Sequence, residues 1–313
     1  MDEAHHELLA EVAAMYYERE MTQNAIAKQL DLSRVKVYRL LKEARERDVV
    51  RITINYPIKR DAQLEARLIE TFALKDAVVL RAGTQTNPLQ RLGVATARYL
   101  ERQLMNHTRL AICMGSSTYE AINAIRPDFH SHVQVTQAIG SLPYAMYEYD
   151  STILTRQLAQ KLGGEAMYLT SPAMADSAEA AAVIRSQRDV QHVLRAACES
   201  DVALVGIGNL DPATSGFVTA NFVKPHELDA LRNDGAVGDI ALQMFCEDGT
   251  LYPHALNDRV IGIKLEDLRN IPLTIAVATG VDKARAILGG IRSGALDVLC
   301  TDDRTANQIL ELN

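Results

Sequence analysis

Long apolar runs and a recognisable leader are both missing from this sequence. No segment approaches the roughly 18 consecutive apolar residues that a membrane-spanning helix needs. The first residues, Met1 to His6, do not combine a basic segment with the apolar segment that follows it in a secretory signal. We therefore expect no membrane partner and predict that the protein acts in the cytoplasm.

Tracts of proline, glycine or serine are also missing, and 48% hydrophobic with 23% charged residues is the composition of an ordinary folded protein. The cysteines are few and far apart, without the paired spacing of a zinc or redox site, so we interpret them as small buried hydrophobes. His130 and His132 can share one strand face, but two ligands are fewer than a zinc site uses. We expect no metal and no cofactor. The cysteines are Cys113, Cys198, Cys246 and Cys300.

Charge is distributed unevenly along the 313 residues. A chain of this length exceeds what one core usually organises, which predicts two domains of unequal size. Residues 1–60 hold 11 Lys+Arg against 10 Asp+Glu, so the net charge of −7 places −8 on the remainder. Residues 28–47 contain seven basic and three acidic side chains. They predict a basic surface on an acidic protein, although a solvated helix face is the usual explanation of a charge run.

The N-terminal segment predicts a helix-turn-helix. Apolar residues spaced three and four apart predict a first helix that stops near Glu20. Thr22 and Ser33 are candidate N-caps of two further helices, separated by a tight turn at Asp31 and Leu32. Two short helices in this order, the second basic, place a recognition helix in the DNA major groove. The apolar positions of the first helix are Leu8, Leu9, Val12, Ala13, Tyr16 and Tyr17. The second and third helices are expected to pack together through Ile26, Ala27, Leu30, Leu32, Val37, Leu40 and Leu41.

Side chains near the start of the third helix are candidates for contact with double-stranded operator DNA. Arg34 can make a bidentate contact to guanine, and Val35 can pack on a thymine methyl group. Phosphate contacts fix position without reading sequence. The further candidates for base contacts are Tyr38 and Arg39, and those for phosphate contacts are Gln23, Ser33, Lys36 and Lys42.

The run after Asp48 alternates and is rich in β-branched residues, which predicts a strand or small wing over Val49 to Tyr56 that Pro57 ends. An amphipathic helix follows, with Leu64 and Leu68 on its apolar side. This helix links the domains, supports a dimer contact, or simply packs against the large domain. The expected division is a winged helix-turn-helix domain at 1–56, a linker helix at 57–75 and an α/β effector domain at 76–313.

From Ala77 onward, short apolar strands alternate with helical stretches. This alternation is typical of an α/β fold with a mainly parallel sheet wrapped by helices. Ligands of such sheets bind at the carboxyl ends of the strands. The predicted strands are Ala77–Leu80, Arg109–Met114, Val133–Ile139, Val202–Ile207, Ile240–Phe245, Leu273–Val277 and Val298–Cys300.

Two strand-to-helix junctions predict a phosphate site. One junction offers backbone N–H groups and three hydroxyls at a helix N-terminus, a natural phosphate cradle, although an ordinary helix cap is the alternative. In the other, Gly280 allows close approach of a ligand and Lys283 adds a positive charge. A solvated surface lysine is the rival explanation, weakened because a cation in a first helical turn opposes the helix dipole. The first junction comprises Gly115, Ser116, Ser117 and Thr118.

Asp239 and Gly208 complete the candidate effector site. Asp239 follows a glycine-rich stretch and can accept hydrogen bonds from sugar hydroxyls. Gly208 lies in a Gly-Ile-Gly-Asn segment after a predicted strand, where backbone can line a pocket.

These residues resemble the sorbitol operon regulator (SorC) family of bacterial regulators. The resemblance implies a Rossmann-like effector domain similar to sugar-phosphate isomerases and glucosamine-phosphate deaminases, and assembly into dimers or tetramers. It also implies effector contacts by Ser116, Ser117, Thr118, Asp239 and Lys283. The matching blocks are Tyr16-Tyr17, Met21 to Gln23, Ile26-Ala27, Leu30, Ser33-Arg34, Val37 to Ala44, Leu64-Glu65 to Phe72, Arg91 to Gly93, Cys113 to Thr118, Asp201 to Gly208, Gly235 to Ile240, Gly280 to Ala284, Thr301 to Asp303 and Thr305-Ala306.

The sequence departs from the family at two turns, where Glu20 and Asp31 stand in place of the usual glycine. Asp31 tolerates a left-handed conformation, but Glu20 does so at a higher cost, so the first turn is expected to differ in shape. The loop from Gly115 to Thr118 is also richer in serine than usual.

The function predicted from these patterns is regulation of a carbohydrate-utilisation operon by a homo-oligomer that responds to a phosphorylated sugar or polyol. An enzyme of the isomerase or deaminase type with an appended DNA-binding domain is the main alternative, because Asp239 and Lys283 also suit acid–base catalysis. A third possibility is a large domain that only oligomerises, since fold does not settle function.

Overall fold

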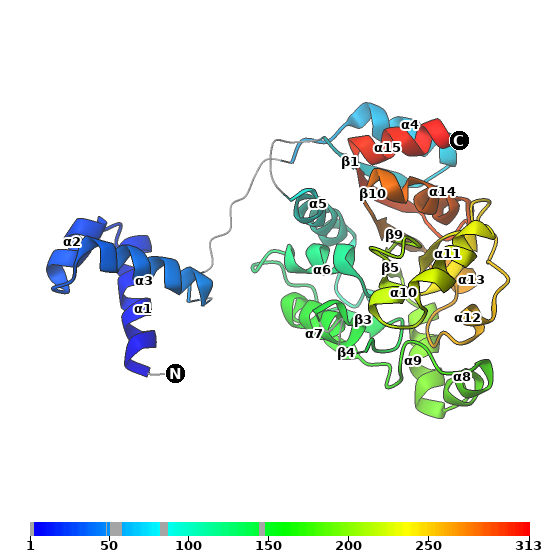
Figure 1. The fold of residues 1–313 in the computed structure, drawn as a ribbon, viewed down its shortest axis with the longest axis horizontal. Helices are drawn as coiled ribbons and strands as arrows, with labels where there is room; N and C mark the ends of the chain where they lie inside the picture. Colours follow the sequence, from blue (N-terminus) through cyan, green and yellow to red (C-terminus); the bar gives the residue numbers. More distant parts are fainter. Residues whose placement is uncertain (1–2, 48, 51–57, 82–86, 144–147) are drawn as a thin grey trace. The chain divides into compact units, whose positions relative to one another are not determined.

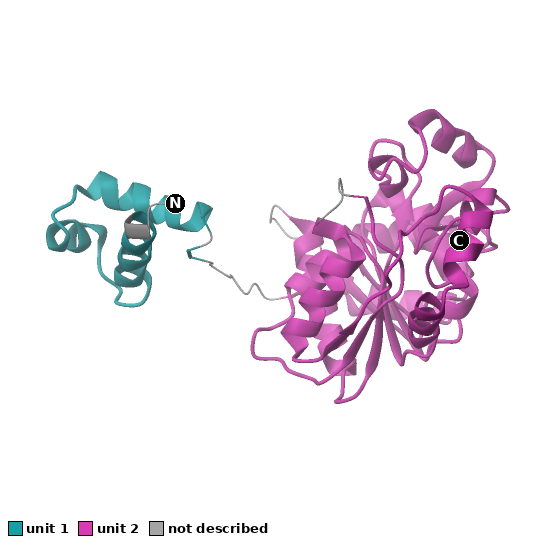
Figure 2. Ribbon diagram, turned by 90° about the horizontal axis from the view of Figure 1, so that it is seen from below, with its two compact units in different colours: residues 1–57 teal, residues 58–313 magenta. Residues whose placement is uncertain are grey.

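The computed structural model describes residues 3–47, 49–50, 58–81, 87–143 and 148–313. The chain divides into two compact units, Met1–Pro57 and Ile58–Asn313, shown in different colours in Figure 2. Within the described residues no helix is both long and apolar enough to cross a bilayer. All four cysteines are described and none forms a disulfide. Cys113 and Cys300 are buried, as predicted, and burial raises the pKa of both thiols to about 12; the other two are only half-buried.

The first unit contains the three helices that the sequence predicts: α1 (Glu3–Tyr17), α2 (Gln23–Gln29) and α3 (Arg34–Glu46). Thr22 and Ser33 are confirmed as N-caps, because their hydroxyl oxygens accept hydrogen bonds from Ala25 N at 3.2 Å and Lys36 N at 3.1 Å. The predicted wing falls largely on residues 51–57, outside the described residues. The core of the unit comprises Leu9, Val12, Ala13, Met15, Ile26, Ala27, Val37, Leu40, Leu41 and Ala44.

Both turns of this unit use a left-handed residue. Glu20 has a φ of 53° and Asp31 a φ of 51°, the region in which glycine is favoured. Glu20 therefore takes the conformation that its side chain makes costly, by about 1–2 kcal/mol. The turn after α1 thus keeps a glycine-like backbone in spite of its glutamate.

The second unit is built on a parallel sheet (Figure 1), in which seven strands of the described chain follow the order β1–β10–β9–β5–β2–β3–β4. From β2 the chain continues to β3 on one side, whereas β5 and β9 lie on the other, so the order reverses between β2 and β5. The strands are β1 (Asp76–Leu80), β2 (Arg109–Ile112), β3 (Gln134–Gln137), β4 (Glu165–Met167), β5 (Val202–Gly206), β9 (Leu273–Val277) and β10 (Val298–Asp302).

Helices cover both faces of this sheet because side chains alternate along each strand. In β1, Val78 and Leu80 belong to one core, with α5, α6 and α7, whereas Ala77 and Val79 belong to the other, with α4, α14 and α15. The helices are α4 (Ala62–Phe72), α5 (Pro88–Gln103), α6 (Ser116–Asn123), α7 (Ser151–Leu162), α8 (Ala178–Arg185), α9 (Arg188–Cys198), α10 (Gly216–Thr219), α11 (Pro225–Asn233), α12 (Ala255–Asp258), α13 (Leu265–Leu268), η2 (Val281–Lys283), α14 (Ala284–Arg292) and α15 (Asp303–Leu312).

The prediction of one strand over Ile240–Phe245 is wrong. The chain instead turns at Ala241 and Leu242, between the antiparallel strands β7 (Ala236–Ile240) and β8 (Gln243–Cys246), which join β6 (Gly208–Asn209) in a small second sheet. Both turn residues have positive φ, 52° and 60°, and both are buried. Neither alanine nor leucine signals such a turn; tertiary packing holds it in place.

The helix predicted as a linker at 57–75 belongs to the second unit. Leu64 and Leu68 of α4 are buried in its core. Glu65 Oε1 accepts hydrogen bonds from Val79 N of β1 at 2.9 Å and from Arg60 Nε at 2.6 Å. Packing against the large domain, one of the three alternatives, therefore describes this helix, and the compact unit begins at Ile58.

Gly93 allows α5 to approach α6 closely. A Cβ added at Gly93 would lie 2.6 Å from the backbone C and O of Glu120, so Gly93→Ala must push the two helices apart. We expect a loss of about 1–3 kcal/mol in the free energy of unfolding, measured by urea denaturation. Gly290→Ala in α14 is the matched control, because its new Cβ would meet neighbours at 3.4–3.5 Å. That substitution should be neutral or stabilising, and equal losses in the two variants would contradict the close contact.

Candidate functional site

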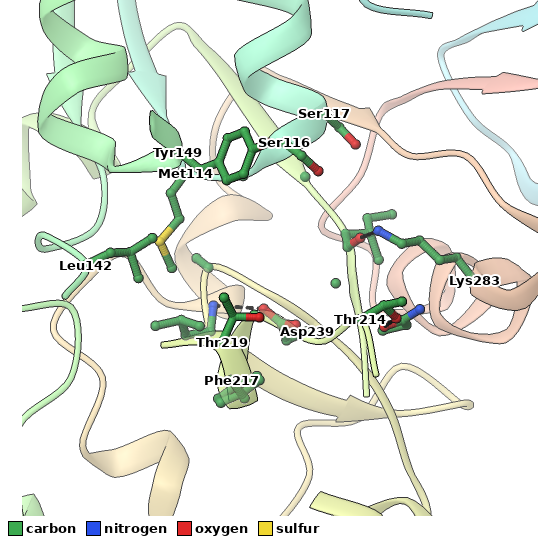
Figure 3. A pocket seen from close by; sticks show the side chains of 18 of the residues that line it. Met114, Ser116, Ser117, Leu142, Tyr149, Thr214, Phe217, Thr219, Asp239 and Lys283 are labelled. Carbon is green, nitrogen blue, oxygen red and sulfur yellow. Dashed lines mark hydrogen bonds between the residues drawn. The ribbon is translucent and has the colours of Figure 1, made fainter. Parts of the chain in front are cut away.

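A cavity lined by most of the candidate effector residues lies in the second unit, at the carboxyl ends of β2 and β5, where the strand order reverses. Its volume is about 830 Å³. Ligands of open α/β sheets bind at this kind of switch point. Figure 3 shows side chains from several separate segments converging on the cavity, among them Ser116, Asp239 and Lys283. The topology therefore brings together residues that are far apart in the sequence.

The N-terminus of α6 forms one wall of the cavity. Its N-cap is Gly115, at φ 132° and ψ 160°, and no described side chain makes a capping hydrogen bond there. The alternative of an ordinary side-chain cap is therefore not what the structure contains. Ser116 and Ser117 follow in the first turn and both line the cavity. Uncapped N–H groups and the positive end of the helix dipole make this wall suited to an anion.

Lys283 lies at the end of η2 and contributes a positive charge to the same cavity. Its Nζ donates one hydrogen bond to Ile207 O at 3.2 Å, and two of its three N–H donors remain for a ligand. The side chain is partly buried, and this burial lowers the pKa of its ammonium group. Lys283 is thus a cavity residue and not a solvated surface lysine.

Asp239 of β7 supplies an acceptor to the same cavity. Its Oδ2 accepts a hydrogen bond from Leu242 N at 3.1 Å. A Cβ at Gly208 would overlap Asp239 Oδ1, so a larger residue at that position would have to displace the Asp239 carboxylate. Burial raises the pKa of Asp239 to about 6, against the opposing effects of the Leu242 N–H and the charge of Lys283. Below that pKa the carboxyl group is neutral and can also donate a hydrogen bond.

The raised pKa of Asp239 predicts a pH-dependent stability. An exposed aspartate titrates near pH 4, so the folded chain keeps a proton that the unfolded chain loses between about pH 4 and about pH 6. The free energy of unfolding therefore falls as pH rises through this window. Asp239→Asn removes this titration and retains an acceptor for Leu242 N. We expect the variant to gain stability relative to wild type from about pH 4 to about pH 7 in urea denaturation; a constant difference would contradict the buried carboxyl.

Six of the eight residues predicted for the effector site line the cavity, and two do not. Thr118 is buried behind the wall, and its Oγ1 has no hydrogen-bond partner in the described part of the chain. Gly280 lines a second cavity, of about 310 Å³, and its N–H donates to Thr305 Oγ1 at 2.9 Å. Gly280 is outside because this end of the turn that carries Lys283 is hydrogen-bonded to the end of β10 and the start of α15. The six are Gly115, Ser116, Ser117, Gly208, Asp239 and Lys283.

The sequence marks Asn209 only as part of a backbone segment, and several other cavity residues carry no sequence signal. Asn209 is buried next to Gly208; its Nδ2 donates to Asp282 Oδ2 at 3.0 Å, and its Oδ1 accepts from Thr214 Oγ1 at 3.1 Å. The other residues that were missed are mostly apolar and come from separate segments, so only the folded chain identifies them. They include Met114, Leu142, Tyr149, Phe217 and Leu242.

In the first unit, the outer face of α3 carries the predicted DNA contacts. Val35 and Tyr38 are 60% and 54% exposed, so both side chains are accessible on this face. The basic side chains of the set are exposed too, and Lys42 pairs with Glu46 at 3.5 Å. Among the described residues no ion pair is formed by Arg34, Lys36 or Arg39. Ser33 Oγ serves as the helix cap, and Gln23, the first residue of α2, is half-buried.

The sequence of this chain is similar to a protein family and to several named proteins. The chain matches a family model described as "Putative sugar-binding domain" over residues 56–311. It is 28% identical over 315 residues to the deoxyribonucleoside regulator of Bacillus subtilis (strain 168), with 99% of each chain covered. It is 29% identical over 315 residues to the erythritol catabolism regulatory protein EryD of Brucella abortus (strain 2308), covering 99% of this chain and 98% of that protein.

A solved structure is also similar to this chain over nearly its whole length. The full-length sorbitol operon regulator SorC from Klebsiella pneumoniae superposes with a TM-score of 0.73 at 27% identity, covering 97% of this chain and 99% of that one. These relatives are named as regulators and not as enzymes, which favours the regulator over the isomerase or deaminase alternative. The chain therefore belongs to the sugar-binding-domain family and is a transcriptional regulator of the SorC type.

Proposed function

We propose that this regulator controls a carbohydrate-utilisation operon by binding operator DNA through α3 and a phosphorylated sugar or polyol in the large cavity. One observation carries the choice of ligand: the uncapped N-terminus of α6 opens into the same cavity as the half-buried ammonium of Lys283. A phosphate group satisfies both, because helix N–H groups and an ammonium are the donors that bind phosphate in proteins. Such a regulator acts in the cytoplasm, where operator DNA is found.

The remaining residues of the cavity are assigned from their chemistry. Ser116 and Ser117 add hydroxyl donors to the phosphate, and Asp239 accepts from a hydroxyl group of the sugar or polyol. Gly208 lets the backbone of β6 approach Asp239 without a side chain between them. In the first unit, Arg34, with its exposed neighbours on α3, binds the major groove.

The effector changes DNA binding only through a difference in its affinity for two arrangements of the protein. We propose that the chain acts as a homo-oligomer, a dimer or a tetramer, because one helix-turn-helix makes a small interface and two related modules read two half-sites. Sedimentation equilibrium of the full chain tests this assembly; a monomer at micromolar concentration would contradict it.

Thermal unfolding of the full chain with a panel of sugars and their phosphates tests the ligand class. A ligand at about 100 times its Kd stabilises the folded state by about 2.7 kcal/mol, which raises Tm by several degrees. We expect at least one phosphorylated compound to do so and its unphosphorylated parent to have no effect. The same mixtures should show no turnover. A panel in which phosphate makes no difference would contradict the proposed cradle.

A further inference from the structure

The cavity is divided into a polar and an apolar part. Figure 3 shows Ser117 and Lys283 towards one side, and Met114, Leu142 and Tyr149 on the other. Leu242 adds a small apolar surface to this wall, whereas Phe217 is fully buried behind it. A sugar or polyol that carries a hydroxyl on every carbon has no matching surface on this side, because its hydroxyls lose water and meet carbon and sulfur.

Few polar groups remain open to a ligand. Asn209 and Thr214 satisfy each other, Asn209 also bonds to Asp282, and the hydroxyl of Thr219 donates to Ser215 O at 3.1 Å. On the polar side, the groups with free capacity are the α6 N-terminus with its two serines, the other donors of Lys283, and the Oδ1 of Asp239. They hold one phosphate and its neighbouring hydroxyls. The exposed Glu148 carboxylate and the Tyr149 hydroxyl are the further polar groups of the described lining.

The volume of the cavity also favours a ligand that has an apolar part. At about 830 Å³ the cavity is in the range of roughly 300–1,000 Å³ that accommodates drug-sized ligands, which exceed a short-chain sugar monophosphate. After a phosphate and its neighbouring hydroxyls are placed at the polar side, space next to the apolar wall remains. Such space contributes affinity only if apolar surface of the ligand fills it.

We infer that the effector is an amphipathic phosphate monoester, an inference that rests on the proposed function. Its phosphate and neighbouring hydroxyls bind near Ser116, Lys283 and Asp239, and its far end is apolar carbon against Met114, Leu142 and Leu242. Phosphorylated deoxy or alkyl-substituted sugars and polyols have this chemistry, whereas fully hydroxylated ones do not.

A homologous series of alkyl phosphates measures the apolar wall separately from the phosphate site. Methyl, propyl and pentyl phosphate carry the same charged group, and their affinities for the full chain are obtained by isothermal titration calorimetry. Each methylene that the wall covers should tighten binding about fourfold, the equivalent of ~0.8 kcal/mol. Met114→Gln should reduce this dependence on chain length and leave methyl phosphate unaffected. Lys283→Met should weaken all three and leave the dependence intact.

The outcomes separate the two claims. Equal affinity for the three alkyl phosphates, in a protein that binds sugar phosphates, would overturn the amphipathic effector and leave the proposed function in place. The amphipathic effector would also be overturned if Met114→Gln and Lys283→Met weakened the binding of the three alkyl phosphates in the same way. If neither alkyl nor sugar phosphates bind, the proposed function fails and the inference fails with it.

Discussion

Lys283→Met is expected to weaken binding of a phosphorylated effector about 10- to 100-fold and to leave the affinity for DNA without effector unchanged. The variant removes a cation but keeps most of the side-chain volume, so the cavity retains its shape. Hydrogen bonds to charged groups contribute about 1.5–3 kcal/mol, and the ammonium of Lys283 has two donors free for a ligand. Calorimetry gives the effector affinity, and fluorescence anisotropy with labelled operator gives the DNA affinity.

Lys264→Met is the matched control for this experiment. Lys264 is exposed and its Nζ forms only a surface ion pair with Glu266 at 3.4 Å, so its removal should change effector affinity little. An undiminished response of the Lys283 variant would exclude this residue from the effector site. Equal losses in the two variants would point to a general effect of charge and not to a phosphate contact.

Arg34→Ala is expected to weaken specific operator binding by about 1–3 kcal/mol and to relax sequence preference. Arg34 is the first residue of α3 and is exposed, and it forms no ion pair in the described part of the chain. Its guanidinium is therefore available to a base edge at no cost to the fold. The measurement is anisotropy with the operator and with a scrambled duplex, compared at one salt concentration.

Arg45→Ala provides the control on the same helix. Arg45 is exposed in the last turn of α3, away from the residues expected to reach bases. Its loss should weaken binding to both duplexes by a similar, smaller amount, as the loss of a phosphate contact or of long-range charge does. If Arg34→Ala left the ratio of the two affinities unchanged, Arg34 would not read sequence.

The first unit was predictable because its signals are local. Thr22 and Ser33 each precede a helix by one residue and cap it with their own hydroxyl, so the caps follow from neighbours in the sequence. The left-handed conformation of Glu20 was harder to predict, since only packing of the folded unit holds a glutamate in that conformation. The local sequence therefore predicts the helices of this unit better than its turns.

The effector site was predictable only in part. Strand-to-helix junctions identified Ser116 and Lys283, which the fold brings to one cavity because parallel strands end at a common edge of the sheet. Their contact with an effector stays a prediction. Gly280 lines the second cavity instead, since its position near Lys283 in sequence does not say which way the turn faces. The hairpin at Ala241 and the apolar wall around Leu142 depend on contacts between distant segments, and no short pattern encodes them.

The proposed regulator binds DNA through α3 of the first unit and senses a phosphorylated metabolite in the cavity of the second unit. This pair of functions is tested most directly by the affinity of the full chain for DNA of its own upstream region, measured against salt concentration with and without sugar phosphates. The account predicts an affinity that falls steeply as salt rises and that at least one phosphorylated compound changes. An affinity independent of salt, or no specific binding with any of these ligands, would contradict it.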